Sequence, residues 1–350
     1  MIKGVLPLRP QQKPDHRQGA PRVVPACARP DLITFACITA TVLLGFMPTL
    51  LSADVLALPP DDMHVIGSDR IVIMRYEDTF SDIAREQNLG YVEMIIANPG
   101  VDPWLPGDGS VVTLPSRLVL PNVGRDGLVI NVAEYRLYYF FRSADRDYVG
   151  TFPIGIGRRD WETPLGETRI LSKMVQPSWH PPESVRAEYA AAGDPLPLVV
   201  APGPDNPLGN YAMRLAMPGY LIHGTNQPAG IGMRVSHGCI RLYPEDIEWL
   251  FQKIAVDTPV RVINQPYKLG WAADGLYLEV HPPLASASVD NTLNMTPITE
   301  QYVKLTVTHS ADVDWDLVTE VFERRSGSPV KIGSRSESIE RLADNDPGLR

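Results

Sequence analysis

One thiol that follows two imidazoles in the sequence is the part of this chain whose residue types could do covalent chemistry. Cys239 and His237 lie in Ser236–Arg241, which reads Ser-His-Gly-Cys-Ile-Arg, and His223 precedes the cysteine by sixteen residues. A thiol becomes a strong nucleophile when it loses its proton, and a nearby imidazole can accept that proton. Gly238 leaves the backbone open, so that the N–H of Cys239 could stabilise an oxyanion. The pattern indicates a cysteine nucleophile with a histidine base.

Either histidine could serve as that base. His237 is two residues from Cys239, and alternate residues of an extended chain point the same way. His223 ends the predicted strand 220–223 and could reach across from a neighbouring strand. Taken singly, a buried cysteine is more often a small hydrophobe, and a histidine at a strand end is more often a surface or core residue. Their joint occurrence favours catalysis.

The N-terminal leader predicts export. Residues 1–31 are basic and rich in Pro, an apolar run follows at 32–51, and Val55–Ala57 offers the small-residue spacing of a signal peptidase site. The apolar run is nearly long enough to span a bilayer, so residues 1–57 are predicted to be a signal peptide or an uncleaved signal anchor. An upstream start codon chosen wrongly would also give a long leader. Whether the leader is cleaved or kept, the rest of the chain is expected outside the cytoplasm, with membrane contact only if the leader is retained.

Removing this leader changes the cysteine count and the charge. Cys27 and Cys37 lie within it, so the exported part keeps only Cys239, which therefore has no partner for an internal disulfide. The formal charge goes from −9 to −12. An acidic chain without basic clusters argues against nucleic acid as a partner.

The chain beyond the leader is too long for one small core and predicts several units. These are an N-terminal unit (69–115), a strand-rich unit (127–265), a C-terminal unit (266–325) and a disordered tail (326–350). The predicted fold class is mainly β, because strands punctuated by Gly and Pro from residue 127 onward are typical of a β-sandwich or barrel. A Pro-rich insertion at 176–209 interrupts these strands, and its Trp179 and Tyr189 favour an ordered lid over disorder.

The N-terminal unit has a strand–helix–helix–strand order and is predicted to be a small α+β module. Its segments Asp78–Ala84 and Ala97–Gly100 resemble the LysM glycan-binding module, with Glu77 where that family usually has Gly. The resemblance implies a glycan anchor, and the alternative is a spacer without a ligand. We expect this unit to fold separately, so that its removal would barely change turnover of a small soluble substrate.

The cysteine motif itself resembles a known catalytic domain. Ser236–Arg241, together with His223–Thr225 and Thr163–Gly166, is similar to the YkuD-type catalytic domain of L,D-transpeptidases, over about residues 127–265. The order of the units resembles the ErfK/YbiS-like periplasmic subgroup of that family. The resemblance implies that Cys239 is the nucleophile and that His223 is the base.

Further residue roles follow from the same resemblance. The carbonyl of Gly224 would orient the imidazole of His223, while His237 and Gly238 would shape the oxyanion site. Arg241 is expected either to bind a substrate carboxylate or to form an internal ion pair that holds its loop. Ser236 and Asn226 are further substrate-binding candidates. No cofactor is implied.

The implied reaction is an acyl transfer on peptidoglycan stem peptides. The thiolate attacks the bond between diaminopimelate and D-Ala of a tetrapeptide, D-Ala leaves, and an amine takes the acyl group. That amine belongs to a second stem, giving a cross-link, or to the C-terminal Lys of an envelope lipoprotein. One alternative is a zinc-dependent peptidoglycan hydrolase with His223, His237 and Cys239 as metal ligands, although the motif holds no Asp or Glu general base. The other alternative is a non-catalytic wall-binding protein.

Overall fold

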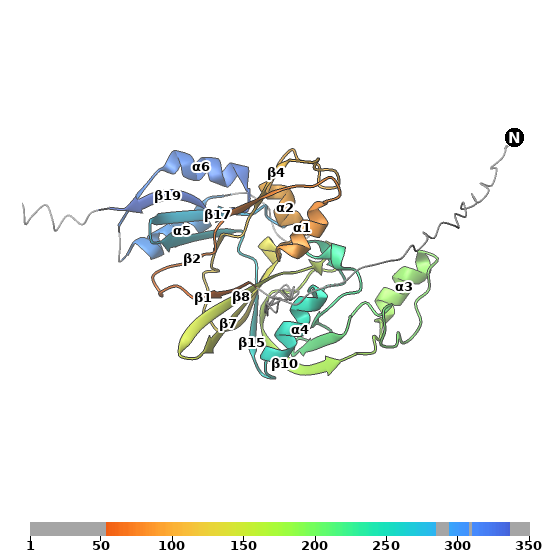
Figure 1. The fold of residues 1–350 in the computed structure, drawn as a ribbon. Coiled ribbons are helices and arrows are strands. Elements are labelled where there is room, and N and C mark those ends of the chain that lie inside the picture. The colour runs from red at the N-terminus through yellow and green to blue at the C-terminus, as the bar shows by residue number, and fades with distance from the viewer. Residues whose placement is uncertain (1–53, 285–293, 308–309, 337–350) are drawn as a thin grey trace, which may run out of the picture. The chain divides into compact units, whose positions relative to one another are not determined.

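A computed structural model describes residues 54–284, 294–307 and 310–336 (Figure 1). Apart from its last four residues, the predicted leader lies outside these ranges. None of the helices formed by the described residues has the length and apolar character needed to cross a bilayer.

The strand-rich unit is built on one nine-stranded mixed sheet. The sheet order is β1 (Asp54–Ala57), β8 (Arg146–Pro153), β7 (Arg136–Ser143), β6 (Gly127–Asn131), β15 (Pro259–Ile263), β10 (Gly166–Val175), β11 (Tyr211–Leu215), β12 (Leu221–His223) and β14 (Ile240–Arg241). The pairs β6–β15 and β12–β14 are parallel, and the other neighbours are antiparallel. The prediction of a strand-rich unit is confirmed, but the fold as a whole is mixed α/β. Of the predicted sandwich or barrel, the structure shows one large sheet curled into a half-barrel.

Helix α4 (Pro244–Lys253) packs on this sheet next to β11. Proline at the first helical position costs nothing, because the N–H that it lacks has no acceptor there in any helix. Ile247 and Leu250 of α4 join buried side chains of the strands, such as Leu128 and Ile222, in the largest apolar core. The core therefore fixes the position of β12, and through the pairing of β12 with β14 it also fixes β14.

A second pairing holds the segment before the cysteine motif. Strand β13 (Arg234–Ser236) lies parallel to the short strand β9 (Ile156–Gly157). The segment that carries Cys239 is thus held between β13 on one side and β14 on the other.

The N-terminal unit has the strand–helix–helix–strand order that its sequence predicts. Strand β3 (Arg70–Ile73) pairs antiparallel with β4 (Val111–Leu114), and helices α1 (Phe80–Glu86) and α2 (Tyr91–Ala97) lie between them in the chain. The hydroxyl of Thr79 accepts a hydrogen bond from the N–H of Asp82 at 3.2 Å and caps α1.

The C-terminal unit is a four-stranded sheet with two helices. The sheet order is β16 (Tyr267–Ala272), β17 (Gly275–Val280), β19 (Val330–Arg335) and β18 (Ala311–Val313), with helices α5 (Thr296–Thr306) and α6 (Trp315–Arg324). The predicted disordered tail is wrong for the part that forms β19. In β19 Ile332 is buried in the core of this unit and Val330 packs against it. The backbone of β19 pairs with both neighbouring strands, so a segment of mostly polar composition is ordered by two apolar side chains and its hydrogen bonds.

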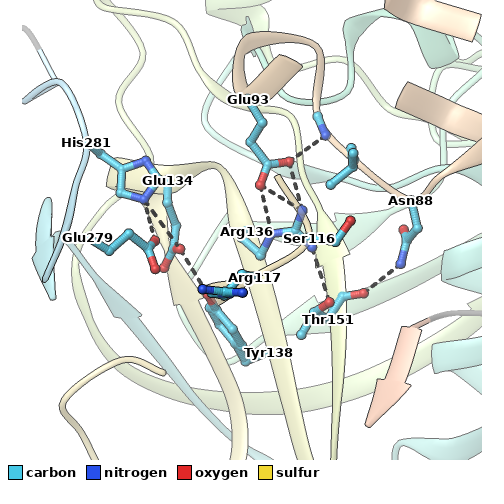
Figure 2. Close-up of polar contacts among 12 residues, drawn as sticks. Asn88, Glu93, Ser116, Arg117, Glu134, Arg136, Tyr138, Thr151, Glu279 and His281 are labelled. Carbon is cyan, nitrogen blue, oxygen red and sulfur yellow. Dashed lines mark hydrogen bonds and ion pairs between the residues drawn. The ribbon is translucent and has the colours of Figure 1, made fainter. Parts of the chain in front are cut away.

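Buried charges join the strand-rich and C-terminal units. The ammonium of Lys268 lies 2.5 Å from a carboxylate oxygen of Glu134 and 2.8 Å from one of Glu279, and all three side chains are almost fully buried. Glu279 also contacts the ring of His281 at 2.6 Å, and the hydroxyl of Tyr138 donates to Glu134 at 2.9 Å (Figure 2). Because a buried charge is costly without a partner, this cluster requires both units to be present.

Strand β1 bears on where the leader ends. Its four residues pair antiparallel with β8, from Asp54 opposite Thr151 to Ala57 opposite Tyr148. Cleavage directly after Ala57 would remove this strand and leave the edge of β8 unpaired. If the leader is cleaved, the pairing therefore favours a cleavage site on the N-terminal side of Asp54.

Strands β2 (Val65–Ile66) and β5 (Leu118–Val119) form a separate two-stranded antiparallel sheet.

Candidate active site

One cavity collects the residues that the sequence singles out. Its volume is about 550 Å³, and its walls include His223, His237, Cys239 and Arg241. Strands β12 and β14 explain why, because they run parallel with His223 opposite Arg241, and Cys239 is the residue just before β14. Alternate residues of a strand share a face, so Cys239 and Arg241 point to the same side of the sheet.

The insertion at 176–209 forms another wall of this cavity. Its helix is α3 (Glu183–Ala191). The residues of the insertion that line the cavity are Ser178, Trp179, His180, Pro182, Val185, Tyr189, Leu196, Val200, Asp205, Pro207 and Leu208. The ordered segment expected from the sequence is therefore present, and it borders the space that contains the thiol.

His223 is a buried, neutral imidazole. Its Nδ1 lies 2.6 Å from the carbonyl oxygen of Gly224, and a carbonyl can only accept, so Nδ1 carries the proton and the basic lone pair of the neutral ring is on Nε2. The backbone of Leu208 also acts on this ring. Burial, together with the positive charge of Arg241, lowers the pKa of His223 to about 3. At neutral pH this ring can accept a proton. The carbonyl of Gly224 thus contacts the imidazole, and its role in orienting the ring stays a prediction.

Cys239 is half-buried, and its thiol is protonated at rest. Burial raises the pKa of the Cys239 thiol, while the backbone of Leu221 and the charge of Arg241 act in the opposite direction. Its sulfur also lies 3.9 Å from the carbonyl oxygen of Gly219, which is a long contact. The same burial that disfavours the thiolate disfavours an imidazolium at His223. The resting state is therefore a neutral thiol and a neutral imidazole that line the same cavity, and the proton must move as an electrophile arrives.

Hydrogen bonds within the motif fix the backbone around the sulfur. The hydroxyl of Ser236 donates to the carbonyl oxygen of Cys239 at 2.5 Å and accepts from the N–H of Gly238 at 3.1 Å. Gly238 has φ +99°, and a Cβ there would lie 2.7 Å from the ring of Tyr220, so only glycine fits. The N–H of Gly238 is thus taken by Ser236. The predicted substrate contact of Ser236 and the oxyanion role of Gly238 both stay predictions.

Thr163 links this loop to the neighbouring strand. Its hydroxyl donates to the carbonyl oxygen of Gly238 at 2.9 Å and accepts from the N–H of Gly157 at 3.0 Å. The segment Thr163–Gly166, which the sequence resemblance includes, therefore contributes one buried side chain that holds the cysteine loop.

His237 connects the loop to the insertion. Its Nε2 lies 3.2 Å from a carboxylate oxygen of Glu188 on α3, and the same oxygen is ion-paired with Arg158. The ring also packs edge-on against Trp161, with 5.1 Å between centroids. Burial and the charge of Arg158 lower the pKa of His237. Glu188, Arg158 and Trp161 were not predicted from the sequence as neighbours of His237. The one signal available was the aromatic content of the insertion, which indicated an ordered segment but not its contacts.

Arg241 offers an unused donor in the cavity. Its backbone exchanges two hydrogen bonds of 2.9 Å with Gly155, so the position of the side chain is fixed at its base. Its Nε is buried and has no hydrogen-bond partner among the residues that the structure describes. Within the same residues no ion pair to Arg241 is present, which favours the carboxylate-binding alternative over an internal ion pair. Asn226 is exposed at the rim of the same cavity.

The geometry does not favour the zinc alternative. Within the described ranges, the one group of three or more His, Cys, Asp and Glu ligand atoms lying within 4.8 Å of one another is Glu134, Glu279 and His281. That group already surrounds the ammonium of Lys268. The three residues expected as zinc ligands, His223, His237 and Cys239, are not assembled in this way.

Comparisons with known proteins agree over most of the chain. Residues 125–262 match the L,D-transpeptidase catalytic domain, and residues 266–332 match the L,D-transpeptidase C-terminal domain. The chain is 41% identical over 298 residues to a probable L,D-transpeptidase, YbiS, of Escherichia coli K12, an alignment that covers 84% of this chain and 96% of the relative. It is 39% identical over 316 residues to the probable L,D-transpeptidase YcfS of the same strain, covering 89% and 97%. Identity to the probable L,D-transpeptidase ErfK/SrfK of Salmonella typhimurium is 41% over 287 residues, covering 79% and 90%.

Proposed function

Because the chain belongs to the L,D-transpeptidase family, a cysteine-dependent family acting on peptidoglycan, we propose that Cys239 is its nucleophile and His223 its base. The observation that carries this assignment is the shared cavity, in which the half-buried thiol and a neutral imidazole with its basic lone pair on Nε2 come from adjacent strands. Burial keeps both groups neutral until substrate binds.

The acylation step then runs as follows. Sγ of Cys239 attacks the carbonyl carbon between diaminopimelate and D-Ala, and its proton passes to Nε2 of His223. The imidazolium gives this proton to the amine nitrogen of D-Ala as the C–N bond breaks. The product is a thioester on Cys239 and free D-Ala. The hydrogen bond from Nδ1 to the Gly224 carbonyl keeps Nε2 directed at the proton throughout.

A second amine completes the cycle. Its nitrogen attacks the thioester carbonyl, His223 takes the amine proton, and the sulfur leaves and is reprotonated. The acceptor is the side-chain amine of another stem peptide or the terminal Lys of an envelope lipoprotein. Both lie outside the cytoplasm, which agrees with the export signal in the leader.

One experiment tests the reaction and separates the two acceptors. Purified protein is incubated with disaccharide tetrapeptide, with and without a peptide ending in Lys, and the products are weighed by mass spectrometry. Release of D-Ala with a cross-linked dimer indicates stem–stem transfer, whereas a new conjugate with the Lys peptide indicates lipoprotein attachment. Absence of D-Ala release under both conditions would contradict the proposal.

Arg241 binds a carboxylate of the stem peptide. A guanidinium with an unused buried donor recognises a carboxylate in a way that a neutral side chain cannot. Asn226, at the rim, is expected to contribute less.

We expect Arg241→Gln to raise KM for the tetrapeptide about tenfold or more, because charge-assisted hydrogen bonds contribute about 1.5–3 kcal/mol. Steady-state release of D-Ala measures this, with Arg241→Lys as the variant that keeps the charge and should recover part of the affinity. The melting temperature should not fall, since no ion pair of Arg241 is lost. An unchanged KM in Arg241→Gln would rule out a substrate contact.

The N-terminal unit supplies a second function, which is binding to the glycan of the wall. Its loops expose large rings and apolar side chains, with Tyr76 83%, Trp104 58% and Leu105 73% exposed. Tyr76 follows β3 and the other two follow α2, and such amphipathic rings suit contact with sugar faces. Glu77, where the resembling module has Gly, leads us to expect modest affinity.

We expect Tyr76→Ala combined with Trp104→Ala to weaken binding to intact sacculi severalfold in a pull-down assay. Ile71→Ala is the control, because Ile71 is similarly exposed, at 69%, but lies within strand β3 and not in these loops. Turnover of a soluble muropeptide should stay unchanged in both. Equal retention by the double variant and the control would leave the unit without a glycan-binding role.

A further inference from the structure

A three-residue loop, Ile231–Met233, lies against the N-terminal unit just before the strand that leads to Cys239. The N–H of Tyr91 donates to the carbonyl oxygen of Ile231 at 3.3 Å, and the N–H of Val92 donates to that of Gly232 at 3.4 Å. These are the first N–H groups of helix α2, which have no acceptor within the helix. The loop therefore caps a helix of the other unit.

Two glycines meet at this contact. A Cβ on Gly90 would lie 2.9 Å from Cα of Gly232, and a Cβ on Gly232 would lie 2.4 Å from Cα of Gly90 and from the backbone nitrogen of Tyr91. Gly232 also has φ +78°, which favours glycine independently. The two backbones are thus in direct contact, and neither position accepts a side chain without movement.

The loop is bound on both of its sides. Met233 packs against the apolar core of the N-terminal unit, which includes Phe80 and Met94. On its other side the N–H of Gly232 donates to the carbonyl oxygen of Ile154 at 3.1 Å, and the carbonyl oxygen of Met233 accepts from Ile156 at 2.9 Å. A shift of α2 would consequently be passed directly to the loop.

Helix α2 is itself fixed to the sheet by a buried ion pair. Arg136 of β7 lies 2.7 and 2.8 Å from the two carboxylate oxygens of Glu93, and both side chains are almost fully buried. Glu93 also accepts from the N–H of Gly90 at 2.6 Å, so the glycine contact and the ion pair share one carboxylate. Nearby, Asn88 donates to the carbonyl oxygen of Thr151 at 2.8 Å (Figure 2). The separately folded unit expected from the sequence is thus in buried contact with the strand-rich unit.

The path from this contact to the sulfur is short and hydrogen-bonded. Strand β13 begins at the residue after Met233 and ends at Ser236. The carbonyl oxygen of Ser236 accepts from the N–H of Arg158 at 3.0 Å, and its hydroxyl binds the backbone of Cys239.

We propose that the N-terminal unit is a positioning element of the active site, acting through Gly90 and Met233 on the backbone that carries Cys239. The inference rests on the proposed role of Cys239 as the nucleophile. Gly90 touches no substrate and acts only through the loop. This positioning role makes the N-terminal unit necessary for turnover of every substrate, including small soluble ones.

The test compares two Gly→Ala variants of the same unit. Gly90→Ala places a methyl group against the loop, whereas Gly100→Ala introduces the same group where no atom lies within 4 Å and where φ +85° strains the backbone. The readouts are kcat and KM for a soluble tetrapeptide, the rate of Cys239 alkylation as a function of pH, and the melting temperature.

We expect Gly90→Ala to lower kcat on the order of tenfold to a hundredfold, because a displacement near 1 Å can have that effect on a reacting group. KM should change less than roughly twofold. The pH profile of alkylation should shift, because the reactivity of the thiol, like kcat, depends on where the thiol lies. Gly100→Ala should lower the melting temperature without changing kcat or the alkylation profile.

A second pair covers the case in which Gly90→Ala does not fold. Met233→Ala removes the side chain that the loop places in the N-terminal core, and Met233→Leu keeps it. Met233→Ala should lower kcat and shift the pH profile of Cys239 alkylation. Met233→Leu should leave both close to their wild-type values. Wild-type kcat and alkylation in a folded Gly90→Ala or Met233→Ala variant would overturn the inference, and so would an equal loss in Gly100→Ala. If the wild-type protein releases no D-Ala, the proposed function fails, and the alkylation profile still decides this inference because it reads the thiol itself.

Discussion

Cys239→Ala is expected to abolish D-Ala release from disaccharide tetrapeptide while leaving the fold intact. Sulfur is the only atom proposed to form the covalent intermediate, and loss of the nucleophile in enzymes with a comparable catalytic dyad costs on the order of 10⁶-fold in kcat. The side chain is half-buried, and its sulfur makes only weak contacts with the backbone, such as the 3.9 Å contact with Gly219, so little stability depends on it. Mass spectrometry of the products and the melting temperature measure the two effects.

Cys239→Ser is the matched variant for this experiment. It keeps the shape and a hydroxyl in place of the thiol, yet a hydroxyl is a much weaker nucleophile in a site without a strong base. Both variants should be inactive, and neither should be alkylated at position 239. More than trace activity in either folded variant would show that another group forms the intermediate.

His223→Ala is expected to lower kcat by about 10²–10⁴-fold, the usual contribution of a general base. In the wild-type protein the imidazole is neutral at all pH values well above 3, so it stays able to accept the thiol proton across the neutral range. Alkylation of Cys239 near neutral pH should slow in the variant for the same reason. His237→Ala is the control, because that ring contacts Glu188 and should matter less to the thiolate.

The pH dependence of stability gives an independent check on His223. Its pKa is lowered by folding from 6.5 to about 3, so its contribution to stability is fully present above pH 6.5 and is lost as the pH falls toward 3. His223→Ala should therefore flatten the decline in melting temperature between these values. Equal alkylation rates in wild type and His223→Ala would remove His223 from the role of base.

The cysteine site could be predicted because its residues lie close together in the sequence. Ser236, Gly238 and Cys239 belong to one segment, and their mutual hydrogen bonds are local. The sequence also suggested that His223 could reach the thiol from a neighbouring strand, but the parallel pairing that places it opposite Arg241 became clear only from the structure. The neutral resting state could not be predicted, since it depends on how deeply the two groups are buried.

Other contacts had no local signal. Glu188 meets His237 across 49 residues of sequence and Arg158 across 30, and an exposed helix with a carboxylate gives no indication of its partner. The contact of Gly90 with Gly232 is equally remote, and two isolated glycines in loops predict only flexibility. Strand β19 was missed because its single buried residue, Ile332, lies among polar neighbours. In each case tertiary packing decided what the local pattern left open.

The buried ammonium of Lys268 also bears on how such enzymes can diverge by recombination. A crossover at residue 265 with a gene that has no cation at position 268 would leave Glu134 without its partner, and an uncompensated buried charge costs about 3–5 kcal/mol. That loss is a large part of the roughly 5–15 kcal/mol that stabilises a typical native protein. Hybrid genes joined at this boundary would encode unstable proteins and be removed by selection. The segments that carry Glu134 and Lys268 are therefore expected to be inherited together, even where the remainder of the gene is exchanged.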